Sequence, residues 1–392
     1  MTRAILTLNS GSSSLKLGLF SETLETLAMA HVDRIGRREA AMQIKDAAGK
    51  PLPMPEHAPN AFKTNGAALR TALEVFQADF PGLEVVAVGH RVVHGGVNHA
   101  APLRLTEEIM KDLARLAPFA PLHQPHNLAG VRASVDTFPG VPNIACFDTA
   151  FHRGHPFVND TYALPHRYYE KGIRRYGFHG LSYDYISGEL ARTEPELAAG
   201  RVVVAHLGSG ASMCAIRGGR SIESTMGFSA VDGLPMGTRT GQIDPGILMY
   251  LMDEEGMDSH QISDLLYKES GLLGMSGVSN DMRTLEASEE PHAAEAVDYF
   301  TYRIRRELAG LAAAMGGIDG LVFCGGIGEN SPHIRARVCE DLGWLGIGVD
   351  PIRNLAHERE IGTGKVRVLV IPTNEEIVIA RAAQAVLATI ED

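Results

Sequence analysis

The chain has 392 residues, of which 45% are apolar, a net charge of −11 and a pI near 5.8. That length accommodates two domains with separate cores, and the acidic balance argues against a nucleic-acid or anionic-membrane partner. The apolar runs are strand-length, which excludes a transmembrane helix, and a strand begins within three residues of the N-terminus, which leaves no room for a signal peptide. We therefore expect a cytoplasmic protein whose four cysteines, none in a CxxC spacing, are buried reduced thiols.

Strand-like and helical patterns alternate along the sequence, as they do in α/β folds. In chain order, the expected elements are strands at 3–8 and 15–20, a helix at 65–78, a strand at 84–93, helices at 106–116 and 126–136, a strand at 142–147, a helix at 180–191, strands at 202–206 and 212–216, helices at 246–255, 260–267 and 291–315, a strand at 320–324, a helix at 332–341, a strand at 366–371 and a helix at 375–389. Residues 47–60 are expected to form a proline-rich surface loop.

A glycine- and serine-rich turn between two apolar strands occurs twice, about half a chain apart. Residues 5–20 read ILTLNSGSSSLKLGLF and residues 202–217 read VVVAHLGSGASMCAIR, so that Gly11 aligns with Gly208 and Ser12 with Ser209. A strand–turn–strand hairpin exposes backbone N–H groups and hydroxyls at its tip, and these suit phosphate oxygens. Two copies predict duplicated domains that grip one nucleotide, in a phosphate-handling protein.

The expected domain boundaries follow from this repeat. Residues 1–150 are predicted to form an N-terminal domain with the first phosphate loop. Residues 151–375 are predicted to form a nucleotide-binding domain with the second phosphate loop and an adenosine loop. The terminal helix, residues 376–392, is expected to pack back on the first domain.

Two further motifs are less specific. The segment 326–331 (GIGENS) lacks the third glycine of a dinucleotide fingerprint. It follows a strand and precedes a helix, so it is either a close approach to a base or ribose or a plain strand-to-helix turn. His90 and His94, on one strand, would lie roughly 13 Å apart, too far to share a zinc ion.

Four polar residues are candidates for the site. Arg91 ends an apolar strand beside two glycines and can meet a carboxylate or a phosphate, or form a structural ion pair. Asp148 follows the strand NIACF, where ligands collect in α/β sheets, although helix capping is the alternative. Arg239, between glycines in MGTRTG, suits a phosphoryl group. His179, in YGFHGLS, is either a site residue or a packing residue.

Together these segments resemble the acetate kinase family, the acyl-phosphate-forming members of the sugar kinase–actin fold group. The resemblance covers essentially the whole chain and involves nine motifs in the same order. They are NSGSSSLK (9–16), GHRVVHGG (89–96), FDTAFH (147–152), YGFHG (176–180), HLGSGAS (206–212), MGTR (236–239), SNDMR (279–283), GGIGEN (325–330) and PTNEE (372–376).

The resemblance implies an α/β fold of two duplicated domains of the actin/sugar-kinase (ribonuclease H-like) type with a cleft between them. It implies reversible, direct in-line transfer of a phosphoryl group from ATP to acetate, giving acetyl phosphate and ADP, with Mg²⁺, or Mn²⁺ in its place, as the metal. The implied partners are these small molecules and, as a homodimer, a second copy of the chain; no nucleic acid or membrane is implied.

Roles for single residues also come from the resemblance. Asp148, His179 and Arg239 take the catalytic roles, and Arg91 binds the substrate carboxylate. Asn9 and Glu375 serve the metal, directly or through water. The residues implied to contact ATP are Lys16, His206, Leu207, Gly208, Ser209, Gly210, Asp281, Met282, Arg283, Gly326, Ile327, Gly328, Glu329 and Asn330.

The chain departs from the family pattern at four positions. Ser209 stands where Asn is common, Tyr183 where His is common, Gln242 where Asp is common and Ala230 where Pro is frequent. None of these is a transfer residue. We therefore expect activity to persist, and nucleotide and acid preferences to be what these changes affect.

The chemistry of the acceptor limits what Asp148 can do. A carboxylic acid is ionised at pH 7, so a general base that deprotonates the substrate has no task. Asp148 is better assigned to orienting Arg91 or Arg239 or to holding metal-bound water. The obstacle to transfer is repulsion between two anions, which fixed cations and donors offset.

Two alternatives stay open from the sequence. A propionate or butyrate kinase would keep every polar residue and differ in the pocket, for which the resemblance implies Val93, Leu122 and Phe178, with Ala230 nearby. One methylene discriminates by only about 1–3 kcal/mol. An actin- or chaperone-like ATPase would share the duplicated loops but would not need Arg91, His179 and Arg239 around an acceptor.

Overall fold

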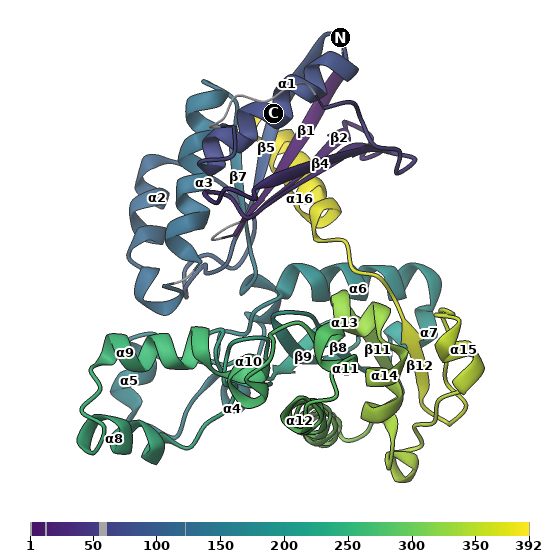
Figure 1. Cartoon of the computed structure of the whole chain (residues 1–392). Coiled ribbons are helices and arrows are strands. Elements are labelled where there is room, and N and C mark those ends of the chain that lie inside the picture. Colours follow the sequence, from purple (N-terminus) through teal and green to yellow (C-terminus); the bar gives the residue numbers. More distant parts are fainter. Residues whose placement is uncertain (1, 12–13, 55–60, 122, 392) are drawn as a thin grey trace. The chain divides into compact units, whose positions relative to one another are not determined.

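The computed structural model describes residues 2–11, 14–54, 61–121 and 123–391 and divides the chain into two compact units. Unit 1 comprises Met1–Ala150 and Asn374–Asp392, and unit 2 comprises Phe151–Thr373. Each unit has its own mixed sheet covered by helices, which confirms the expected α/β class (Figure 1).

In the described part of unit 1 the strands form a seven-stranded sheet in the order β4-β3-β2-β1-β5-β7-β6. Its strands are β1 (Thr2–Ser10), β2 (Leu15–Ser21), β3 (Thr26–Asp33), β4 (Ala41–Asp46), β5 (Leu83–Val92), β6 (Leu103–Arg104) and β7 (Asn143–Phe147). Its helices are α1 (Asn65–Asp79), α2 (Glu107–Ala114), α3 (Gln124–Thr137) and α16 (Glu375–Glu391). Strands β1 to β4 pair antiparallel, whereas β1, β5 and β7 run parallel, so polar residues at the ends of these three strands meet at one edge.

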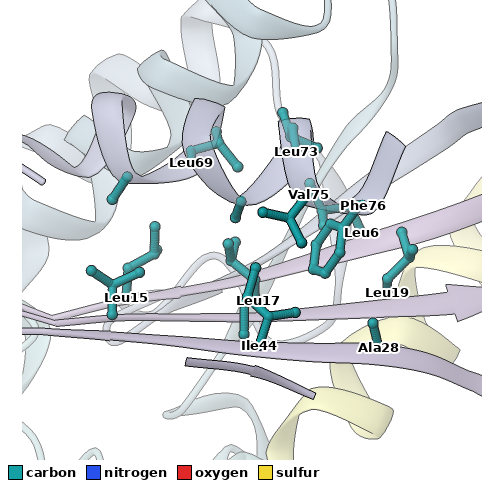
Figure 2. Close-up of a cluster of buried hydrophobic side chains, with 14 of the residues drawn as sticks. Leu6, Leu15, Leu17, Leu19, Ala28, Ile44, Leu69, Leu73, Val75 and Phe76 are labelled. Carbon is teal, nitrogen blue, oxygen red and sulfur yellow. The ribbon is translucent and has the colours of Figure 1, made fainter. Parts of the chain in front are cut away.

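The core of unit 1 explains why α1 forms where it does. Thr64 caps the helix by accepting a hydrogen bond from the backbone N–H of Ala67, and the following turns place Leu69 and Phe76 against the sheet. Figure 2 shows these side chains facing Leu6 and Leu17 from β1 and β2. Burying each such side chain contributes roughly 1.5–3 kcal/mol to the stability of the fold. This packing holds the β1–β2 hairpin, whose first strand ends at the site, in place.

Helix α16 packs against β1, β5 and β7. The approach is close at Gly89, where an added Cβ would lie 2.5 Å from Cγ2 of Ile379. Because only glycine leaves this space free, the helix can bring its first residue, Glu375, down to the strand ends.

Unit 2, whose residues all lie in the described range 123–391, has a five-stranded sheet in the order β10-β9-β8-β11-β12. The strands are β8 (Arg201–Leu207), β9 (Ala211–Arg217), β10 (Arg220–Ser224), β11 (Gly320–Cys324) and β12 (Arg367–Val370). Helix α6 (Gly180–Thr193) packs against β8, and α12 (Pro291–Met315) packs against β8, β9 and β10 (Figure 1). The other helices are α4 (Phe157–Asp160), α5 (His166–Glu170), α7 (Pro195–Ala198), α8 (Pro245–Asp253), α9 (Ser259–Asp264), α10 (Gly271–Ser276), α11 (Met282–Glu286), α13 (Gly325–Asn330), α14 (Pro332–Cys339) and α15 (Pro351–Leu355).

The two sheets share one strand arrangement. The order β3-β2-β1-β5-β7 in unit 1 corresponds to β10-β9-β8-β11-β12 in unit 2. In both, three antiparallel strands are followed by two strands parallel to the first, so β1–β2 and β8–β9 are equivalent hairpins. The sequence repeat is therefore a repeat of the fold.

The strands expected from the sequence are all present, within two residues at each end, and the long helices are present as well. The sequence reading missed β3, β4, β6, β10 and the short helices. In strands β3 and β4 buried residues alternate with more exposed ones over most of their length, so neither strand is a continuous buried apolar run like β7. The expected helix at 260–267 is α-helical only to Asp264 and continues as a π-turn from Leu265 to Glu269, and residues 55–60 of the expected loop lie outside the described part. Within the described residues, no helix is long and apolar enough to cross a bilayer.

Candidate active site

In unit 1 four polar side chains meet where β1, β5 and β7 end. Arg91, next to last in β5, donates from Nε to Oδ1 of Asp148 at 2.9 Å and from Nη2 to Oδ2 at 2.6 Å. Its Nη1 lies 3.3 Å from Oε2 of Glu375 and 3.4 Å from Oδ1 of Asn9. Asn9 in turn donates from Nδ2 to Glu375 at 3.2 Å. Parallel strands bring Asn9, Arg91 and Asp148 to this edge, and α16 supplies Glu375.

The charges in this cluster perturb one another. Burial disfavours the charged form of Arg91, but the carboxylates of Asp148 and Glu375 outweigh that effect and raise its pKa above the ordinary value. Burial raises the pKa of the Asp148 carboxyl, and the Arg91 guanidinium opposes this shift. Burial and the neighbouring Glu375 raise the pKa of Glu376. The guanidinium is thus held in one orientation by a two-pronged carboxylate contact.

The cluster contains more carboxylates than cations. Lys16 lies directly opposite Asn9 in the β1–β2 pairing and acts electrostatically on Glu376. Carboxylate and amide oxygens are the ligands that Mg²⁺ and other hard divalent cations prefer, so Asn9 and Glu375 fit such an ion chemically. No group of three or more His, Cys, Asp or Glu side chains in the described part of the chain is arranged to hold a metal by itself. His90, whose pKa burial lowers to about 4, lies with Nε2 2.7 Å from Oδ1 of Asn143.

Of the residues expected to line an acid pocket, Val93 is in unit 1 and Phe178 is in unit 2, and both are buried. The backbone N–H of Val93 donates to Oδ1 of Asn127 at 3.0 Å, and Asn127 donates to the carbonyl of Ser10 at 2.7 Å. Asn127 therefore joins the end of β5 to the first glycine/serine turn, a role that the sequence reading missed. Leu122 and Ser12 lie outside the described residues.

In unit 2 the glycine/serine turn between β8 and β9 is tied to the segment that carries Arg239. The N–H of Gly208 donates to the carbonyl of Gly210 at 3.1 Å, and the N–H of Gly237 donates to the carbonyl of Ser209 at 3.0 Å. Arg239 Nη1 donates to the carbonyl of Ala230 at 3.0 Å. The turn and the arginine thus form one hydrogen-bonded assembly.

His179 faces this same turn. It precedes α6 with φ 55° and ψ 24°, a left-handed conformation that non-glycine residues rarely adopt outside special sites. A Cβ added to Gly210 would lie 3.3 Å from His179 Nε2 and 3.8 Å from Arg239 Nη1. The imidazole stacks on His206 with ring centroids 4.4 Å apart. His179 and Arg239 therefore converge on the turn, with His206 behind.

Two further segments of unit 2 surround the expected nucleoside region. Asp281 caps α11 and accepts two hydrogen bonds from the side chain of Arg283, which lowers the pKa of Asp281. That Arg283 side chain is 89% exposed, whereas Met282 is buried. A flat exposed guanidinium can stack on an aromatic base.

The segment 325–330 forms the short helix α13 directly after β11. Glu329 turns its carboxylate inward, where it accepts from the N–H groups of Gly325 at 2.8 Å and Thr373 at 3.1 Å. Arg335 donates to the carbonyls of Gly328 and Glu329, both at 2.9 Å. A Cβ added to Gly326 would meet nothing within 4 Å, so the outer side of this turn is open. Glu329 and Arg335 fix the turn from inside and leave its outer side available to a ligand.

Two of the four residues that depart from the family pattern have defined hydrogen-bond partners. Gln242 accepts from Arg303 Nη2 at 2.7 Å, so an amide replaces a carboxylate beside a buried arginine. Tyr183 is fully buried, and its hydroxyl lies 2.5 Å from Ser212 Oγ. Ser212 was missed from the sequence, although the β8–β9 hairpin pairs it with His206 and so places it beside the turn.

The duplicated sheets, with a glycine/serine turn in each, define the actin-like class of α/β folds. Within that class, the chain belongs to the acetokinase family, whose model matches residues 4–381. A relative from Methylocella silvestris named acetate kinase is 52% identical over 401 aligned positions, covering 99% of this chain and 98% of the relative. A crystal structure of Porphyromonas gingivalis acetate kinase matches with a TM-score of 0.85 and 37% identity, covering 98% of this chain and all of that one. A crystal structure of a propionate kinase from Francisella tularensis matches with a TM-score of 0.90 and 34% identity over the same shares.

Proposed function

We propose that the protein transfers the γ-phosphoryl group of ATP to acetate, giving acetyl phosphate and ADP, and catalyses the reverse reaction. The observation that carries this proposal is the Arg91 guanidinium, which Asp148 orients through two hydrogen bonds at the strand ends of unit 1. A planar cation held in one orientation is what recognition of a small carboxylate requires. An ATPase without an acyl acceptor would have no use for it.

In the transfer step, a carboxylate oxygen of acetate bonds to the γ-phosphorus while the bond from that phosphorus to the bridging oxygen of ADP breaks. The acid is already an anion, so Asp148 does not act as a base but as the residue that orients Arg91. The hydrogen atoms of Arg91 not committed to Asp148 are the donors for the acid. Glu375 and Asn9 set the position of Nη1.

Asn9 and Glu375 would hold Mg²⁺, or Mn²⁺ in its place, directly or through water. Enzymes of this family use a divalent metal with ATP, and the ion offsets negative charge on the phosphates. The surplus of carboxylates over cations around Arg91 supports this assignment.

The phosphate chain of ATP is assigned to unit 2, with Lys16 from unit 1. Backbone groups of the segment 206–210 would cradle phosphate oxygens, while Arg239 and His179 would stabilise the charge of the transferring group. The convergence of Arg239 Nη1 and His179 Nε2 on Gly210 supports these roles. Charge stabilisation of this kind is the main contribution available to a phosphotransferase.

The nucleoside is assigned to the segments 281–283 and 326–330. The exposed Arg283 and the open outer side of Gly326 support stacking of the base there. Glu329 contributes by holding the turn rather than by touching ATP, because backbone N–H groups occupy Oε1 of its carboxylate.

Propionate is the second candidate acceptor, because the Francisella tularensis propionate kinase matches this chain closely in structure. The test is an ATP-dependent assay in which hydroxylamine traps acyl phosphate, run on acids of two to four carbons. We expect kcat/KM to be highest for acetate, lower for propionate and lowest for butyrate. A maximum at propionate would establish the second candidate, and ATP hydrolysis without hydroxamate from any acid would contradict the kinase proposal.

We also propose that the protein is a homodimer and that it is located in the cytoplasm. Helix α8 has no buried residue, and four of its side chains (Ile247, Met249, Tyr250 and Met252) are 45–58% exposed. An apolar helix left open in this way suits a second copy of the chain. Light scattering should give about twice 42.2 kDa, and Met249→Glu should halve that mass, whereas Val135→Glu, at an exposed valine of α3, should not. A cytoplasmic location suits an enzyme that uses ATP.

A further inference from the structure

A chain of three side chains runs from the core of unit 2 to His179. The hydroxyl of Tyr183, on the first turn of α6, lies 2.5 Å from Ser212 Oγ on β9. Ser212 Oγ in turn lies 2.8 Å from His179 Nδ1. Tyr183 and Ser212 are both fully buried.

Tyr183 determines the direction of these hydrogen bonds. Its ring packs against the rings of Phe151 and His152, and burial raises its pKa well above the ordinary value, so it stays protonated. A buried O–H needs an acceptor, and among the described residues Ser212 Oγ is the oxygen that lies at hydrogen-bond distance. In the opposite direction, Ser212 would donate to Tyr183 and leave the phenol hydrogen without an oxygen acceptor.

The direction of the Ser212–His179 hydrogen bond, and with it the tautomer of His179, follows from how many hydrogen atoms each group can donate. A serine hydroxyl has one hydrogen and can accept two bonds. If it accepts from Tyr183, its own hydrogen is available for His179 Nδ1. A neutral imidazole that accepts at Nδ1 carries its proton at Nε2. Nε2 is the nitrogen that lies beside Gly210, and Arg239 Nη1 lies near the same glycine.

We propose that Tyr183 and Ser212 are positioning residues that hold neutral His179 with its proton on Nε2, ready to donate to the transferring phosphoryl group. The proposal rests on the role assigned to His179 in the proposed function. A phenol always carries a hydrogen that needs an acceptor when it is buried, and here that acceptor is the serine hydroxyl. In this chain the direction is therefore fixed.

The stacked His206 belongs to a separate chain of bonds. Its Nδ1 lies 2.8 Å from Ser182 Oγ, which lies 2.8 Å from Thr373 Oγ1. Changes at Tyr183 or Ser212 therefore leave the partners of His206 in place, and His206 serves as an internal reference.

The test uses the full chain labelled with ¹⁵N in its histidine rings, with the His179 signals identified by their loss in His179→Gln. In the unchanged protein we expect Nδ1 of His179 to resonate as an unprotonated nitrogen and Nε2 as a protonated one. In Tyr183→Phe and Ser212→Ala we expect a mixture of tautomers at His179 and no change at His206. We also expect kcat to fall about tenfold, while KM for acetate and for ATP changes by less than about twofold.

Tyr176→Phe is the matched control, because Tyr176 is also buried in unit 2 and its hydroxyl donates to the backbone carbonyl of Gly172 at 2.7 Å. It should leave both the His179 signals and kcat unchanged. A protonated Nδ1 in the unchanged protein would overturn the proposal even if neither variant folds. So would a loss of kcat in Tyr183→Phe with unchanged His179 signals, since that would be a purely structural effect. Full activity of His179→Gln with the expected tautomer would refute the catalytic role of His179 and leave the hydrogen-bond chain established.

Discussion

The same sheet edge carries an ion pair in unit 1 and a carboxylate bonded to backbone N–H groups in unit 2. In unit 1 the ends of β5 and β7 carry Arg91 and Asp148, which form a two-pronged ion pair. In unit 2 the corresponding edge carries His206, bonded to a serine, and an α13 turn in which the Glu329 carboxylate accepts from the backbone N–H groups of Gly325 and Thr373. Duplication thus preserved the strand order but not the chemistry at the strand ends.

This difference matches what each half of a phosphoryl transfer requires. A small acid offers one carboxylate, and a guanidinium in a fixed orientation recognises it. A triphosphate spreads its charge over many oxygens, so a glycine-rich turn with N–H groups and neutral donors suits it better, with Arg239 as the added cation. Each of the following predictions tests this difference between unit 1 and unit 2.

The largest effect is expected at Arg239. Arg239→Ala should lower kcat by about 10²–10³-fold, because it removes a cation that meets charge developing in the transition state. KM for acetate should change little, since the carboxylate of the acid is assigned to Arg91 in the proposed function. Initial rates at saturating ATP would measure both, with Arg192→Ala, an exposed ion-pair arginine on α6, as the control. A kcat within tenfold of the unchanged protein would place Arg239 outside the transfer site.

Arg91→Ala should instead raise KM for acetate by about 10²-fold, because it removes the guanidinium that binds the carboxylate of the acid. If Asp148 only orients Arg91, adding Asp148→Asn to Arg91→Ala should change little, although Asp148→Asn alone should weaken acetate binding. A double-mutant cycle on KM measures this coupling. Additive effects would mean that Asp148 acts on the reaction independently of Arg91.

Acid should weaken unit 2 more than unit 1. Burial lowers the pKa of His152 to about 4 and that of His155 to about 3, both below the unfolded value near 6.5. Because the unfolded chain takes up protons at these histidines before the folded chain does, the free energy of unfolding is highest above pH 6.5 and decreases as pH falls toward 4. Each histidine lowers it by about 2 kcal/mol by pH 5. Among the described residues of unit 1, burial lowers the pKa of His90 to about 4 and also lowers that of His31, whereas Asp148 and Glu376, whose pKa values are raised, shift stability the opposite way.

Hydrogen exchange of the slowest amides in each sheet, at pH 7 and pH 5, would measure the difference. We expect unit 2 to lose about 30-fold more protection than unit 1, because it has two histidines whose pKa values lie at about 4 and about 3, whereas in unit 1 the pKa of His90 lies at about 4. His155→Gln should remove about half of the acid sensitivity of unit 2. Equal losses in the two sheets would contradict the assignment.

The smallest effect concerns the acid pocket. Val93→Ala should open room for an additional methyl group and change the acetate-to-propionate ratio of kcat/KM about tenfold in favour of propionate. Val92→Ala truncates the adjacent buried valine, which points to the opposite face of β5, and should lower stability without changing the ratio. If Val93→Ala changes the ratio by less than about twofold, acid preference is set elsewhere, with Ala230 the next position to change.

The features that the sequence predicts are local patterns, whereas those that it does not predict depend on contacts between residues that are distant in sequence. The two hairpins and the ends of β5 and β7 were predictable, because apolar strands and glycine turns are local patterns, and parallel strands bring their ends to one edge. Tyr183, Ser212 and Asn127 were not recognised as part of the site, since each acts through a partner that is distant in sequence. Glu329 shows the same limit, since its bonds to the backbone N–H groups of Gly325 and Thr373 could not be read from the motif.

The assignment of Asn374–Asp392 to unit 1 has a consequence for synthesis on the ribosome. Unit 2 is one continuous stretch, so it can fold as soon as Thr373 has emerged. Unit 1 still lacks α16 at that moment, and with it the Ile379 contact at Gly89 and the Glu375 contact to Arg91. The usual order, in which the N-terminal domain matures first, is therefore reversed. If the proposed assignments hold, the nucleotide half is complete before the acid half, and a nascent chain would bind acetate in a finished site only after α16 has been made.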